Sequence, residues 1–122
     1  MYDNETIKDI KRLNFEDLIW IIFIIISILN IIGNENEKNY LKTSNNSFKK
    51  SANKIFEFTI TATFFIYTYF FIRNFKSYKE SSSNEKRIFS IKLLGTSFLI
   101  AGIICLLYFQ ENENTFFGSP AI

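Results

Sequence analysis

The residue types that carry most protein chemistry are scarce in this chain. It has no histidine, so it lacks the usual proton shuttle, triad base and metal ligand. Its one cysteine, Cys105, cannot form an internal disulfide and lies in an apolar run, where a structural role is favoured over a catalytic one. Asp3, Asp9 and Asp17 stand in charge-mixed sequence, and no phosphate-binding loop or nucleophile elbow is present. We therefore predict no enzymatic activity, no bound metal and no cofactor.

Glu57 is the carboxylate with the best claim to chemistry inside a membrane, where an ionisable side chain is a functional candidate by default. It lies about one helical turn from Lys54 and from Thr61, and at similar depth to Asn30 and Asn34. We predict that these five residues form a polar intramembrane cluster. One interpretation is an ion-binding position. The favoured one is that Glu57, near the edge of its apolar run, reaches out to water or pairs with Lys54.

The elements that must position these residues are three long apolar runs, separated by connectors rich in Lys, Asn and Ser. A bilayer core of about 30 Å requires about 20 helical residues. The first run is apolar on all sides, as is typical of a helix that faces lipid. We predict an all-α, small polytopic membrane protein, a single membrane domain over residues 1–122. The three transmembrane helices are expected at about 18–33, 55–73 and 91–109.

Two features leave other structures open. The hydrophobic content of 48% is ordinary for a globular protein, so a soluble three-helix bundle is the rival, disfavoured because the apolar residues are so strongly segregated. The stretch 58–64 alternates apolar residues with threonine like a strand, but a lone strand in lipid would leave its amides unpaired. A helix is therefore expected there.

The segments outside the spans carry helix signals of their own. Ile7, Ile10 and Leu13 suit a short amphipathic helix on the membrane surface before the first span, although a frayed polar terminus fits them equally well. The acidic leader and the lack of a cleavage pattern predict that the first run stays as an anchor. Ser82 and Glu85 have the spacing of a capping box, which predicts that the third helix starts near Ser83.

Small residues on the third run predict a helix-packing face. Ser97, Ala101 and Cys105 recur every four residues, and Gly95 and Gly102 widen this ridge. Small side chains let helix backbones approach closely in lipid, where apolar burial alone gains little. We name these five residues the small-residue face.

Six residues in and beside the first run, most of them polar, also share one side of the expected helix. At 100° per residue they fall in one narrow sector, which we expect to face protein. The sector comprises Glu16, Trp20, Phe23, Ser27, Asn30 and Asn34. At the opposite membrane edge from Lys54, the pair Glu16 and Asp17 is expected to share a surface with Arg73, Arg87 and Lys92.

The distribution of basic residues predicts the orientation. The N-terminal segment and the second connector share one side, which carries nine Lys or Arg residues, whereas the first connector carries five and the C-terminal tail none. Short loops rich in Lys and Arg stay in the cytoplasm. We predict a multi-pass protein of the cell membrane with its N-terminus cytoplasmic and its C-terminus outside.

Partner binding is the activity that these features favour. We predict an integral membrane protein that acts through helix–helix contacts with another membrane component or with itself, as an accessory, regulatory or immunity-type protein. Its expected partners are the lipid bilayer and another membrane protein or a homo-oligomer, and the net charge of +2 argues against nucleic acid. The alternatives are an oligomeric transporter or channel subunit with a polar path at Glu57, and a holin-like pore former. Heavy use of Ile, Lys, Asn and Phe is typical of AT-rich bacterial genomes.

Overall fold

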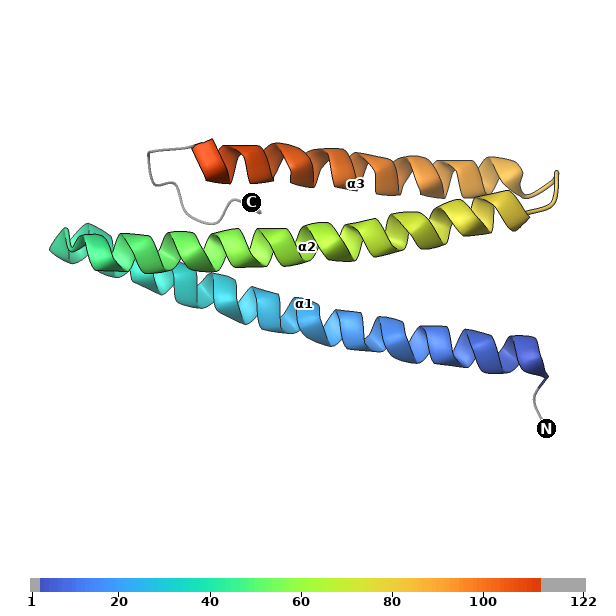
Figure 1. Ribbon diagram of the computed structural model, residues 1–122, viewed down its shortest axis with the longest axis horizontal. Coiled ribbons are helices and arrows are strands. Elements are labelled where there is room, and N and C mark those ends of the chain that lie inside the picture. The colour runs from blue at the N-terminus through green and yellow to red at the C-terminus, as the bar shows by residue number, and fades with distance from the viewer. Residues whose placement is uncertain (1–2, 113–122) are drawn as a thin grey trace.

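The computed structural model describes residues 3–112, and these form three α-helices and no strand (Figure 1). The helices are α1 (Asn4–Thr43), α2 (Asn46–Glu80) and α3 (Lys86–Asn112). All three are long and apolar enough to cross a membrane. The predicted all-α fold with three candidate spans is therefore confirmed, and each predicted span lies inside one helix. The predicted placement of the C-terminus outside the cell concerns residues beyond the described range.

Helix α1 is continuous from its first turn, so the described structure has no separate surface helix before the first span. Asp3 caps α1, because its Oδ1 accepts a hydrogen bond from the Thr6 amide at 2.7 Å. The helix ends at Thr43 and is capped by Ser44, which adopts a left-handed conformation with φ of 59° and donates its amide to the Tyr40 carbonyl. At about 1.5 Å per residue, the 40 residues of α1 span roughly 60 Å, about twice a hydrocarbon core.

The other two helices start where their local hydrogen bonds allow. The Asn45 side chain caps α2 by accepting from the Ser47 amide at 3.0 Å. Helix α3 begins at Lys86 rather than near Ser83, because the amides of Glu85 and Lys86 both donate to the Ser82 carbonyl and form a turn first.

Helix α2 lies between α1 and α3, which run along its two sides (Figure 1). No Cα atom of α1 lies within 8 Å of one in α3 among the described residues. The core between α1 and α2 is built on Ile19, Ile26 and Ile66. Every close approach of two helix backbones in the described chain therefore involves α2.

Close packing fixes α1 against the beginning of α2. Gly33 is buried, and a Cβ atom built on it would lie 2.5 Å from Cε1 of Phe56, which is itself 1% exposed. One turn away, the Thr59 hydroxyl lies 2.8 Å from Oδ1 of Asn30. It also lies 3.1 Å from the Phe56 carbonyl, so its single hydrogen has two acceptors to choose between.

The strand-like stretch at 58–64 is helical, as predicted for a chain in lipid. The Thr63 hydroxyl donates to the Thr59 carbonyl at 2.8 Å, one turn back in its own helix. Thr68 does the same with Phe64 at 2.9 Å. These local bonds satisfy hydroxyls that the alternating pattern would otherwise place on one face of a strand.

Candidate functional site

Glu16 is the centre of a polar network at one edge of the apolar layer. Its Oε1 accepts from Nη1 of Arg73 at 2.6 Å, and its Oε2 accepts from the Tyr69 hydroxyl at 3.2 Å. The Arg12 side chain lies 3.9 Å from the same Oε2. Glu16 is only 7% exposed, so its carboxylate is held almost entirely by groups of the protein.

The network continues from α2 to α3. Nη2 of Arg73 donates to Oδ1 of Asn74 at 3.2 Å, and the Asn74 amide donates to the Thr96 hydroxyl. Thr96 then donates to the Lys92 carbonyl at 3.0 Å, within α3. Asn74 and Thr96 are 4% and 6% exposed. One chain of hydrogen bonds thus joins all three helices.

Burial makes this network energetically important. A buried polar group without a partner is costly, and removal of one member of a buried charged pair strands the other. Among residues 3–112, every buried side-chain nitrogen or oxygen has a hydrogen-bond partner. The network is therefore fully satisfied and fixes the rotation of each helix about its axis at this depth.

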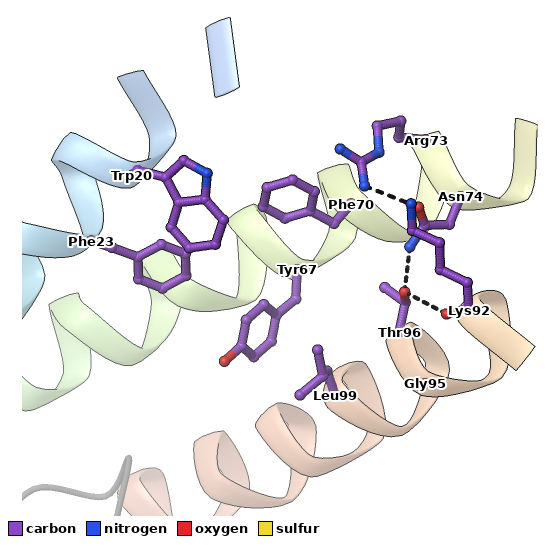
Figure 2. A pocket seen from close by; sticks show the side chains of 10 residues that line it. All are labelled: Trp20, Phe23, Tyr67, Phe70, Arg73, Asn74, Lys92, Gly95, Thr96 and Leu99. Carbon is purple, nitrogen blue, oxygen red and sulfur yellow. Dashed lines mark hydrogen bonds between the residues drawn. The ribbon is translucent and has the colours of Figure 1, made fainter. Parts of the chain in front are cut away.

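A cavity of about 620 Å³ lies beside the network (Figure 2). Trp20 and Phe23 of α1 stand on one side of α2, and α3 contributes the other side. From α2 the lining residues are Tyr67, Phe70, Arg73 and Asn74, and from α3 they are Lys92, Gly95, Thr96 and Leu99.

Aromatic contacts build the α1 side of this cavity. The ring centroids of Trp20 and Phe70 are 6.0 Å apart, and those of Phe23 and Tyr67 are 6.4 Å apart. The Arg73 guanidinium lies 4.9 Å from the centroid of Phe70, so the charged group also covers an aromatic face. The cavity is therefore apolar at its aromatic end and cationic where it meets the network.

The structure does not join the five residues predicted as a polar cluster. Asn30 bonds to Thr59 rather than to Thr61, which is half-buried. Lys54 and Glu57 are exposed and form no ion pair within residues 3–112. Asn34 is half-buried next to Gly33. Of the cluster, only Asn30 takes part in a described hydrogen bond between helices.

Most of the small-residue face of α3 is exposed in the described chain. Gly95, Ala101, Gly102 and Cys105 are exposed, and a Cβ added at either glycine would meet nothing within 4 Å. Ser97 is half-buried and donates to the Leu93 carbonyl at 2.9 Å. Within the described chain, α3 instead buries Thr96 and Ile103 against α2.

Sequence reasoning found part of the network and missed the rest. It placed Glu16, Arg73 and Lys92 at the same membrane edge from the ends of the apolar runs. It did not place Tyr69, Asn74 or Thr96 in a polar network. For Asn74 and Thr96 the sequence offers one signal of a contact: they are amide and hydroxyl side chains at matching depth in successive helices.

The described residues define the class of this protein only coarsely: an all-α chain with three helices that are able to cross a membrane. Within them, no group of three His, Cys, Asp or Glu residues is placed to hold a metal ion. Comparison with protein-family models, with curated proteins and with solved structures finds no match.

Proposed function

We propose that the protein is a non-enzymatic multi-pass membrane protein that acts through helix–helix contacts of α3 with a second copy or with another membrane protein. The observation that carries this proposal is the exposure of the small-residue face. The most apolar 18 residues of α3 are only 11% buried, against 17% for α1 and 28% for α2. Helix α3 therefore has the most surface left for a partner.

The chemistry of that face suits protein better than lipid. Gly95, Ala101 and Gly102 leave the α3 backbone open over two helical turns. Such a surface gains dispersion contacts and close backbone approach from another helix, whereas mobile lipid tails fill it less well. Its position on the outer side of the helix array leaves it accessible to a partner within the membrane.

The test replaces Ala101 and Gly102 by leucine, singly and together. Because nothing in the described chain lies near a side chain at Gly102 and Ala101 is exposed, the fold should be retained. Association should weaken by about 1–2 kcal/mol, roughly tenfold, because the leucine holds the partner helix away. The measurement is co-purification in mild detergent of a second, differently tagged copy and of any stoichiometric partner.

Ser27→Leu is the matched control, because Ser27 is an exposed small residue on α1 whose hydroxyl bonds only to the Phe23 carbonyl of its own helix. It should leave association unchanged. Oxidation of the native Cys105 gives a second measurement, since two copies that pack through this face bring their thiols close to disulfide distance. Unchanged association in Ala101→Leu/Gly102→Leu contradicts the proposal, as does the absence of any partner or second copy with the native chain.

The proposed orientation places the N-terminus in the cytoplasm. Its support is the excess of basic residues on the side shared by the N-terminal segment and the α2–α3 connector. Under this orientation the polar network and its cavity lie at the cytoplasmic edge of the membrane, and the contact of Gly33 with Phe56 lies nearer the outer edge.

A further inference from the structure

We propose that the cavity bounded by α1, α2 and α3 binds one anionic phospholipid. Its phosphate would lie at Lys92 and Arg73, and an acyl chain would lie against the rings of Trp20, Phe23 and Tyr67 (Figure 2). This site is separate from the small-residue face except at Gly95, which borders both.

The first argument is charge. Of the ten described residues that line the cavity, Arg73 and Lys92 are cationic and none is acidic. Glu16 lies outside the lining and offsets the charge of Arg73. Lys92 is exposed, and its ammonium forms no ion pair within residues 3–112, so one positive charge is left for a ligand. The guanidinium of Arg73 uses two of its five N–H groups in the network, which leaves donors for a phosphate oxygen.

The second argument is depth. Arg73 and Lys92 stand at the ends of their apolar runs, where phospholipid headgroups meet the hydrocarbon layer. Tyr67 and Leu99 lie six and seven residues further in, which is about 9–10 Å along the helix axes. The cavity therefore changes from cationic to apolar over the same distance and in the same direction as a phospholipid does.

Tyr67 supplies a third argument. Its hydroxyl makes no hydrogen bond in the described part of the chain, and the residue is half-buried within a predicted span. Because Tyr67 lines the cavity, a molecule that enters the cavity can reach this residue. A phospholipid carries ester carbonyl acceptors between its phosphate and its chains, whereas a free phosphate ion carries none at that depth.

The cavity suits a lipid better than a helix. Its volume lies within the range of roughly 300–1,000 Å³ that single small ligands occupy. Bulky rings line its α1 side, whereas a helix partner is favoured by small residues. Since no Cα atom of α1 lies within 8 Å of one of α3 in the described chain, we expect a lipid to enter between these two helices from the membrane.

The lone tryptophan of the chain makes the test direct, because Trp20 lines the cavity. The full chain is reconstituted in phosphatidylcholine vesicles that contain brominated phosphatidylglycerol or, at the same mole fraction, brominated phosphatidylcholine. Bromine quenches indole fluorescence at short range, so quenching reports which lipid is next to Trp20. The attraction between one basic side chain and an anionic lipid predicts roughly fivefold enrichment of phosphatidylglycerol next to Trp20.

Two substitutions separate a site from a charged surface. Lys92→Gln should abolish the excess quenching by phosphatidylglycerol, whereas Arg87→Gln, which removes an equal charge five residues earlier on α3, should retain it. Gly95→Leu should fill part of the cavity without any change of charge, because Gly95 lines it. The fold should be retained, because a Cβ atom added at Gly95 meets nothing within 4 Å. Circular dichroism confirms that each variant is helical.

Four results would overturn the proposal. Equal quenching by the two brominated lipids removes the preference, and equal loss in Lys92→Gln and Arg87→Gln assigns it to diffuse surface attraction. Weak quenching by both lipids that rises in Ala101→Leu/Gly102→Leu would mean that a second copy, not a lipid, covers Trp20.

Inorganic phosphate at constant ionic strength should not compete with the lipid, and full competition would show that the site binds the phosphate alone. Unchanged association in Ala101→Leu/Gly102→Leu, together with an intact lipid preference, would refute only the function proposed for α3.

Discussion

Two glutamates near the ends of the apolar runs have opposite surroundings. Glu16 is buried, and both of its carboxylate oxygens accept hydrogen bonds from α2. Glu57 is exposed on α2 and has no ion pair among the described residues. A carboxylate that can reach water at the interface needs no partner, whereas one enclosed by two helices does. The structural role therefore belongs to Glu16.

Glu16→Gln should lower the free energy of unfolding by about 2 kcal/mol, because it weakens a charged hydrogen bond and leaves Arg73 without its counter-charge. Glu57→Gln should change it by less than about 0.5 kcal/mol, as is usual at exposed positions. The measurement is a denaturant titration in micelles followed by helix content. Equal effects of the two substitutions would show that burial of Glu16 contributes nothing to stability.

The residue scale also shows what a single sequence can predict. The membrane edge shared by Glu16 and Arg73 follows from run ends alone, because ionisable residues mark where lipid stops. The contact between Asn74 and Thr96 does not, because it depends on how α2 and α3 are rotated about their axes. Several other polar pairs, such as Asn30 with Thr61, fit the sequence equally well, and only packing selects Thr59 as the partner.

At the scale of helices, the rotation of α1 departs from the predicted polar sector. The residues that α1 buries are Glu16, Ile19, Ile26 and Gly33, whereas Trp20 and Ser27 of that sector are exposed. The last three buried residues recur every seven residues and contact α2 through Ile66 and Phe56. The Ser27 hydroxyl donates to a carbonyl of its own helix, so Ser27 needs no hydrogen-bond partner in α2. Close packing, rather than polarity, decided this face.

A pair of glycines tests that packing. Gly33→Ala should destabilise the protein by about 1–3 kcal/mol, because the added Cβ overlaps the buried ring of Phe56. Gly102→Ala should stabilise it by up to about 1 kcal/mol, because alanine favours helix and the new methyl group meets nothing. The same unfolding titration measures both. A stabilising Gly33→Ala would mean that α1 and α2 are further apart than described.

The start of α1 should depend on pH. The Thr6 amide donates to Asp3 and lowers the pKa of that carboxyl from its ordinary value of 3.8. Since the pKa is lower in the folded helix, the charged cap stabilises the first turn above pH 3.8, and this stabilisation is lost as the pH falls through the lowered pKa. The chemical shift of the Thr6 amide in micelles, followed from about pH 5 to about pH 2, measures it.

Asp3→Asn provides the control, because asparagine caps a helix about as well and does not titrate. Its Thr6 amide should retain the capped chemical shift over the same range. A Thr6 amide that titrates identically in both proteins would assign the pH effect to another group.

The whole molecule is a one-layer array in which the outer helices share only α2 (Figure 1). Its element types, their number and the approximate spans follow from apolar runs and connector composition, because lipid permits few backbone structures. Which pairs of helices contact each other does not follow, since three apolar helices can also pack as a triangle. The opening between α1 and α3 is evident only from the structure, in which the backbones of these two helices do not approach each other.

The orientation of this array gives a further prediction. Ser44 and Ser82 are exposed, one in each connector, and are suitable sites for single cysteines in a Cys105→Ser background. A reagent that does not cross membranes should label Ser44→Cys from outside intact cells and Ser82→Cys only after the membrane is opened. Permeabilised cells, in which both sites react, provide the control. The reverse pattern would place the polar network at the outer edge.

The arrangement of hydrogen bonds also bears on the order of assembly during synthesis. The described side-chain bonds between α1 and α2 use Glu16, Asn30, Thr59, Tyr69 and Arg73, and none uses an atom of α3. The first two helices can thus become a complete hairpin as soon as the ribosome has delivered them to the bilayer. Helix α3 then packs on the preformed surface of this hairpin, where Asn74 is already placed to donate a hydrogen bond to Thr96.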